Sequence, residues 1–131
     1  MRRDQSFLSQ YRDIGLAGSV SDATPHRLVL LLLQSARTRI RTAVVAIEQN
    51  DAARKAKAIN GAYSILEGLR ITLDHRSGGE IASGLDAIYQ YGGRRLVEAN
   101  AANDPNHLHE VDSLLQEIES AWSQIPASAH G

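Results

Sequence analysis

Several residue types that build particular kinds of site are absent or rare in this sequence of 131 residues. It contains no cysteine, which excludes a disulfide scaffold, a thiolate zinc site and a cysteine nucleophile. Aromatic residues make up only 5% of the chain, so the hydrophobic 43% is mostly aliphatic. This balance favours helices packed around an ordinary globular core.

The chain also lacks a strong charge of either sign and any apolar segment of membrane length. Its 14 basic and 15 acidic residues leave a net charge of −1, too little to attract nucleic acid or anionic lipid at long range. The longest apolar run, Leu28–Leu33, is far shorter than the roughly 20 residues that cross a bilayer. The first residues include Asp4 and Gln5 and have no signal-peptide pattern. We therefore expect a cytosolic protein that binds neither nucleic acid nor membrane.

Apolar residues recur at steps of three and four, the spacing typical of a helix with one buried face. The first such segment begins at the cap-and-proline pair Thr24-Pro25 and ends near residues 50–51. The second is closed by Ser77-Gly78-Gly79, since glycine readily ends helices. These two segments have the stripes Val29, Leu33, Ala36, Ile40, Ala43 and Ile47, and Ile59, Ala62, Tyr63, Leu66, Leu69 and Leu73.

The third and fourth helical segments are separated by Asn103-Asp104-Pro105, which supplies a stop followed by a new cap and proline. Their stripes are Ile81, Leu85, Ile88, Gly92, Leu96 and Ala99, and Leu108, Val111, Leu115, Ile118, Trp122 and Ile125. Because short connections force neighbouring helices to reverse direction, the sequence predicts an all-α, antiparallel four-helix bundle over residues 24–125. Residues 1–23 are expected to form a tail, with room for one short helix, that packs partly on the bundle; residues 126–131 should be a disordered tail.

The start of the first helix has more apolar surface than one buried stripe needs. Leu28, Leu31 and Leu32 project beside the stripe, and Leu30 projects on its other flank. Either this end is deeply buried between its neighbours and the tail, or it forms a groove that the tail closes until a partner displaces it. Because burying one leucine is worth about 1.5–3 kcal/mol, something must cover these side chains.

Small residues on the second and third helices form another anomaly. Ala58, Gly61, Ile65, Gly68 and Thr72 are predicted to face away from the core stripe of the second helix. This face is either a shallow strip that another backbone can approach or merely a surface that tolerates small residues. On the third helix, Tyr89 and Tyr91 lie beside Gly92-Gly93, which is compatible with a kink, a pocket or a tight helix contact.

Catalytic and metal-binding patterns were sought and are missing from the sequence. It has no Glu-x-x-His pair for a di-iron site, no nucleophile elbow and no phosphate-binding loop. The cluster His107, His109 and Glu110 lacks a complete ligand set and is interpreted as solvated. We therefore expect no enzyme activity, metal or cofactor.

A run of three arginines on the first helix could contact phosphate groups. However, the three side chains fan over different sides of the helix in a nearly neutral protein, so a solvated face is the preferred interpretation. These residues are Arg37, Arg39 and Arg41.

The order of these motifs resembles that of the flagellar secretion chaperone family, FliS, over about residues 11–122. The motifs are Tyr11, Val20–Val29 (VSDATPHRLV), Leu73-Asp74, Gly78–Ala82 (GGEIA), Arg95–Asn100 (RLVEAN), Asn103-Asp104, Glu110-Val111 and Trp122. The chain departs from the family at Gly92-Gly93, where larger residues are usual.

The resemblance implies a cytosolic chaperone that holds the disordered C-terminal segment of flagellin, prevents its premature polymerisation and keeps it competent for the flagellar type III export apparatus. In the family, the N-terminal segment covers a groove and is moved by flagellin. We expect a monomer or weak dimer; the alternative is a self-associating helical adaptor without a client. The expected flagellin-binding residues are Tyr11, Ile14, Leu28, Leu31, Leu32, Ala58, Gly61, Ile65, Gly68 and Tyr89.

Overall fold

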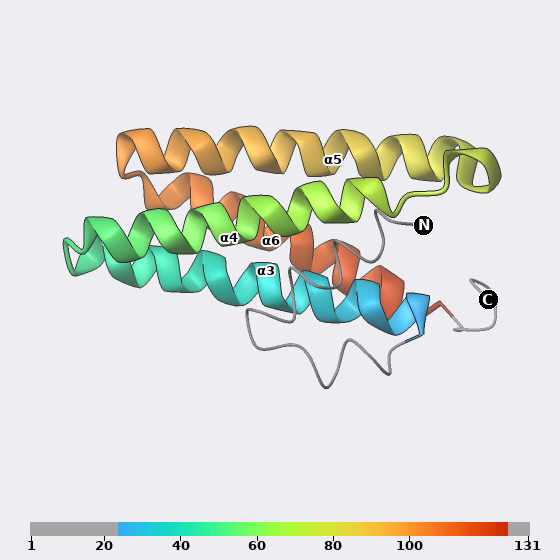
Figure 1. The fold of residues 1–131 in the computed structure, drawn as a ribbon, viewed down its shortest axis with the longest axis horizontal. Coiled ribbons are helices and arrows are strands. Elements are labelled where there is room, and N and C mark those ends of the chain that lie inside the picture. The colour runs from blue at the N-terminus through green and yellow to red at the C-terminus, as the bar shows by residue number, and fades with distance from the viewer. Residues whose placement is uncertain (1–23, 126–131) are drawn as a thin grey trace.

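The computed structural model describes residues 24–125, which form four α-helices and, within this range, no strand (Figure 1). The helices are α3 (Pro25–Glu48), α4 (Ala52–Ile71), α5 (His75–Ala102) and α6 (Pro105–Ser123). The predicted all-α bundle is confirmed. The predictions for residues 1–23 and 126–131 lie outside the described residues.

The four helices form a closed ring in which each packs against two others. Consecutive helices are in contact along the chain, and α6 returns to pack against α3. Short connections make α3 and α5 run in one direction and α4 and α6 in the other (Figure 1). The start of α3 and the end of α4 therefore lie at the same end of the bundle.

Capping residues fix most helix boundaries where the sequence predicted them. The Thr24 hydroxyl accepts a hydrogen bond from the Arg27 amide at 3.1 Å, and Pro25 begins α3. Asn103 ends α5 in the left-handed conformation, with φ 53°, and the carboxylate of Asp104 caps α6. These side chains satisfy backbone groups that a helix end leaves without partners.

The boundary between α4 and α5 differs from the prediction. Helix α4 ends at Ile71, and the Asp74 carboxylate caps α5 by accepting from the amides of Arg76 and Ser77. Gly79, at φ 50° and ψ −122°, interrupts α5 after its first turn instead of closing α4. Ile81, a predicted core residue, is 75% exposed, whereas its neighbour Ala82 is buried. The break at Gly79 changes which residues of this segment face the core.

The core contains most of the other predicted stripe residues. Large side chains from all four helices are fully buried at its centre, including Leu33, Ile40, Ile59, Leu66, Leu69, Leu96, Leu108 and Leu115. Several stripe residues at its margins are partly exposed but pack against it: Val29, Ile47, Leu73, Leu85 and Ile118. Tyr63 is the predicted stripe residue of α4 that reaches the surface, with 38% exposure.

Gly92 and Gly93 allow α5 to approach its neighbours closely. A Cβ atom on Gly92 would lie 3.2 Å from Leu66 Cδ1 and 3.5 Å from Val111 Cγ1. A Cβ on Gly93 would lie 3.1 Å from the ring of Tyr63. Of the three possibilities for this pair, the structure shows the tight contact; the break in α5 is at Gly79.

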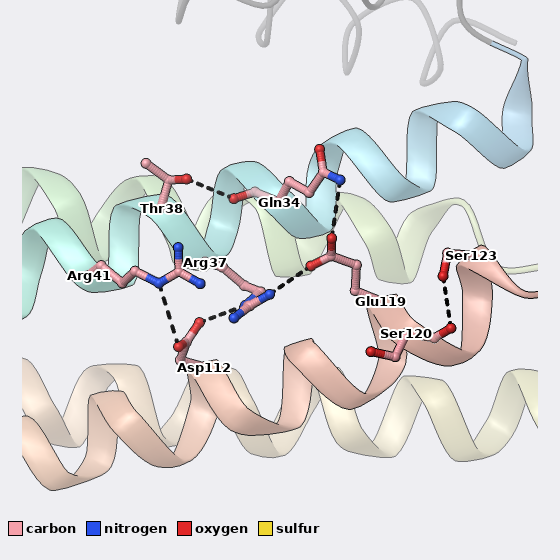
Figure 2. Close-up of polar contacts among 8 residues, drawn as sticks. All are labelled: Gln34, Arg37, Thr38, Arg41, Asp112, Glu119, Ser120 and Ser123. Atoms are coloured by element: carbon pink, nitrogen blue, oxygen red, sulfur yellow. Dashed lines mark hydrogen bonds and ion pairs between the residues drawn. The ribbon is translucent and has the colours of Figure 1, made fainter.

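Ion pairs join α3 to α6 along one side of the bundle (Figure 2). Arg37 donates to Asp112 at 2.8 Å and to Glu119 at 2.9 Å, while its side chain is only 14% exposed. Burial alone would lower the pKa of Arg37, but these bonds outweigh it and raise the pKa. The predicted solvated face is therefore wrong for Arg37, whereas Arg41, 3.7 Å from Asp112, is 58% exposed.

Polar contacts also join α6 to α5 and, at one end of the bundle, to the start of α3. Arg95 donates to Glu110 at 2.8 Å, and the Tyr91 hydroxyl donates to the same carboxylate. His26 and Trp122 stack with ring centroids 5.5 Å apart, and the Trp122 indole donates to the His26 carbonyl at 3.0 Å. These contacts lock α6 onto both neighbouring helices.

We predict that Gly92→Leu destabilises the bundle by about 1–3 kcal/mol, because the added side chain overpacks the contact with Leu66 and Val111. Gly84→Leu is the matched control, since a Cβ there meets nothing within 4 Å. It should be neutral or stabilise by up to about 1 kcal/mol through helix propensity. Urea denaturation measures both. Equal stability of Gly92→Leu and the wild type would contradict the tight contact.

The contribution of Glu110 to stability should depend on pH. Hydrogen bonds from Tyr91 and Arg95 lower the pKa of Glu110 below its ordinary 4.5. Its stabilising effect is thus present above pH 4.5 and is lost as the pH falls through the lowered value. The difference in unfolding free energy between the wild type and Glu110→Gln should be largest at neutral pH and shrink in acid.

The matched control for this measurement is Glu117→Gln on the same helix. Glu117 is exposed and belongs to none of the ion pairs among residues 24–125. Its substitution should leave stability unchanged at neutral and acidic pH. A Glu110→Gln difference that stayed constant with pH would show that the carboxylate does not act through its charge.

Candidate functional site

The leucines at the start of α3 divide into core and surface residues. Leu30, Leu32 and Leu33 are buried, and Leu32 belongs to the central cluster. Leu28 packs against this cluster but remains partly exposed, as does Leu31. Of the three leucines expected to flank the stripe, Leu32 is therefore a structural residue here, and Leu28 and Leu31 are available at the surface.

Three of the five residues expected on an outward face of α4 are buried. Ala58 is 6% exposed, Ile65 is fully buried, and Gly68 is also buried. A bundle helix has two neighbours, so it is buried over a wider arc than one stripe. On this face, Gly61 lies against the Arg39 side chain of α3. The prediction that this face is exposed is therefore wrong for Ala58, Ile65 and Gly68, whereas Gly61 is partly exposed and Thr72 is exposed.

The aromatic residue expected at the site is also in the core. Tyr89 is 2% exposed, and burial raises the pKa of its hydroxyl to about 12. It therefore presents no surface for a partner in this state. Tyr11 and Ile14, the two expected site residues in the N-terminal segment, lie outside the described residues.

Arg39 occupies the contact between α3 and α4. Its side chain lies across Gly61, where an added Cβ would be 3.0 Å from Arg39 Cδ and 3.3 Å from Nη1. Arg39 Nε is buried without a hydrogen-bond partner. A buried donor left unsatisfied costs about 1–3 kcal/mol, so this guanidinium is poorly served by the residues around it. Arg37 and Arg41 instead turn toward α6.

A shallow, open cleft of about 380 Å³ lies between α4 and α5. The ring of Tyr63 packs beside Gly93 at this cleft, and Val97, 57% exposed, is another apolar residue of its lining. Arg70 donates to Asp86 at 2.7 Å next to it and thereby lowers the pKa of that carboxyl. The lining mixes two arginines with two glutamates: Arg70, Arg94, Glu67 and Glu98. The cleft therefore has no net charge that would favour an anionic or a cationic ligand.

Two residues of the cluster His107, His109 and Glu110 form polar contacts between α5 and α6. His107 Nδ1 is 2.9 Å from Arg95 Nη2, and Glu110 binds Tyr91 and Arg95. The prediction that this cluster is solvated is therefore wrong for His107 and Glu110. Among residues 24–125, no three His, Asp or Glu side chains are arranged to hold a metal ion. None of the four helices is long and apolar enough to cross a membrane.

Sequence reasoning missed the roles of Arg39 and Tyr63. The spacing places Arg39 on a different side of the helix from Arg37 and Arg41, and this was the available signal that it has a different partner. Which helix each one meets depends on the order of helices around the ring, which periodicity cannot give. Likewise, the sequence could not pair Tyr63 with Gly93.

Comparisons with known proteins agree on one family. Residues 7–129 match the family described as flagellar protein FliS. The flagellar secretion chaperone FliSB of Pseudomonas aeruginosa is 43% identical over 118 residues, covering 90% of this chain and 94% of that protein. FliS of Salmonella typhimurium is 37% identical, with 95% and 93% covered, and FliS of Bacillus subtilis is 38% identical, with 81% and 78% covered.

Proposed function

The chain belongs to the FliS family of flagellar proteins, and on this premise we propose that it is a cytosolic export chaperone that binds the disordered C-terminal segment of flagellin. Relatives named flagellar secretion chaperones support a chaperone role in flagellar export. Holding this segment would prevent premature polymerisation and keep flagellin competent for the flagellar type III export apparatus. The role requires no catalytic residue, metal or cofactor.

The observation that carries the proposal is apolar surface at the end of the bundle where α3 begins and α4 ends. Leu28 and Leu31 are partly exposed there, and Ile71 at the end of α4 is 50% exposed. A disordered amphipathic segment can fold on such a surface and lay its apolar turns against it. Burying a whole leucine is worth about 1.5–3 kcal/mol, so the partly buried Leu28 and Leu31 each contribute a fraction of this value and the client's own apolar side chains supply the rest.

The buried members of the expected site would act indirectly. Leu32 and Ile65 are fully buried members of the central core cluster, against which Leu28 also packs. A substitution at either position would therefore test stability before it tested binding. In the proposal, direct contacts are made by Leu28, Leu31 and Gly61, which keep part of their surface exposed.

We predict that a peptide covering the flagellin C-terminal segment binds the full chain with a Kd of about 1 μM or tighter, measured by calorimetry. The peptide should gain helical circular dichroism on binding, as expected for coupled folding. Leu31→Glu should weaken binding at least about tenfold, because it removes apolar contact area and adds a charge. No detectable complex with the wild type would overturn the proposed function.

Val45→Glu is the matched control for Leu31→Glu. Val45 lies on the same helix and is 38% exposed, but it is 14 residues away, about 21 Å along the helix axis. It should bind the peptide as the wild type does. Sedimentation of the free protein separates the alternative function, since large oligomers that bind no peptide would indicate a self-associating adaptor.

A further inference from the structure

Charge is divided unequally between the two halves of the bundle. Residues 24–73, which include α3 and α4, carry eight Lys and Arg against three Asp and Glu; residues 74–125 carry three against nine. The near-neutral total therefore hides a positive helix pair beside a negative one. Because exposed charges act over a Debye length of about 10 Å, a partner at α3 and α4 meets mainly the positive pair.

Ion pairs neutralise the negative half far more than the positive half. Six of the nine acidic residues in 74–125 are in ion pairs: Asp86, Glu98, Asp104, Glu110, Asp112 and Glu119. In contrast, five of the eight basic residues in 24–73 are in none of the ion pairs of the described chain: Arg27, Arg39, Arg54, Lys55 and Lys57. Uncompensated charge is thus concentrated on α3 and α4.

Arg39 is the best placed of these cations to receive an acidic group. Its stem lies on Gly61 and its Nε is buried without an acceptor, so the guanidinium is already partly desolvated. Lys57 is exposed one helical turn before Gly61 on the same side of α4. Lys55, in contrast, is buried and donates to the Asn100 carbonyl at 2.9 Å.

We infer that Arg39 recognises a carboxylate of the bound segment, with Lys57 as a second cationic contact. This inference rests on the proposed function and deepens it: the client is an acidic amphipathic segment whose apolar turns meet Leu28 and Leu31 and whose acidic turn meets Arg39. Arg39 lies eight residues beyond Leu31 on α3, about 12 Å along its axis, so one helical client segment spans both. A charge-assisted bond to a desolvated guanidinium is among the stronger polar contacts.

A second copy of the chain is a poorer occupant of this surface. Most carboxylates of residues 74–125 are already in ion pairs within the chain. Asp74, one of the three others, caps α5. The copy would therefore offer few free carboxylates to Arg39. Self-association remains an outcome that the experiment detects.

The test compares Arg39→Met with Arg41→Met in binding to the flagellin C-terminal peptide. Both remove one positive charge from α3 and keep a long apolar stem, but Arg41 points toward Asp112. Arg39→Met should weaken binding about tenfold and reduce its salt dependence, while Arg41→Met should bind as the wild type does. Lys57→Met, at an exposed position that cannot disturb the core, should weaken binding about threefold.

Two further readouts separate recognition from a structural role. Replacing the contacted Asp or Glu of the peptide by its amide should abolish the difference between wild type and Arg39→Met, as in a double-mutant cycle. The unfolding midpoint of free Arg39→Met should be unchanged or higher, because the variant loses an unsatisfied buried donor. A lower midpoint, with peptide affinity equal to that of the wild type, would show that Arg39 is only structural.

The remaining outcomes separate this inference from the proposed function. If the wild type binds the peptide and neither Arg39→Met nor Lys57→Met changes the affinity, the recognition of a carboxylate by this surface is wrong and the proposed function stands. If the wild type does not bind, both are wrong. If Arg39→Met instead dissociates a dimer of the free protein in sedimentation, the occupant of this surface is a second copy.

Discussion

The close contact between α3 and α4 is the constraint on which the rest of the molecule depends. These two helices make the most extensive contact in the bundle, and Gly61 on α4 leaves room for the Arg39 side chain. Leu32 on α3 and Ile65 on α4 are completely buried, whereas Leu28 and Leu31 keep part of their surface exposed. The packing of α3 against α4 therefore also determines which leucines and which arginine remain at the surface.

The polar residues divide into two groups with different consequences. Along the other seams, arginines meet carboxylates from the neighbouring helix, as Arg37 does with Asp112 and Arg70 with Asp86. These pairs fix the order of the helices but leave little charge for a partner. The contact between α3 and α4 has no such pair among the described residues, and Arg39 lies there with a donor to spare. In the proposed function, the ion-paired helices would form a stable bundle, and the surface of α3 and α4 would bind a disordered chain.

Much of the fold could be predicted because its signals are local. Period and caps located four helices, and Thr24, Asn103 and Asp104 end or begin them where expected. The errors arose where tertiary contacts decide the outcome. The small face of α4 looked exposed because periodicity identifies one buried stripe but not a second neighbour, and Ile81 looked buried because the backbone break at Gly79 shifts the phase of the stripe.

The candidate site was predictable only in part for the same reason. The excess of leucine at the start of α3 was visible in the sequence. The resemblance to the FliS family suggested that these leucines bind a client segment. However, Leu32 is buried and Leu31 is not, although the sequence analysis placed both beside the stripe; Leu32 lies three residues after Val29 and four before Ala36, in phase with that stripe. Arg39 was grouped with Arg37 and Arg41, although it meets α4 while the other two meet α6.

The most direct test is a methyl NMR titration of the leucine-labelled full chain with the flagellin C-terminal peptide. The account predicts that the Leu28 and Leu31 resonances shift most and show intermolecular contacts, while Leu108 and Leu115, the buried leucines of α6, change little. Shifts confined to leucines near the cleft between α4 and α5, with Leu28 and Leu31 unchanged, would contradict the placement of the client on α3 and α4.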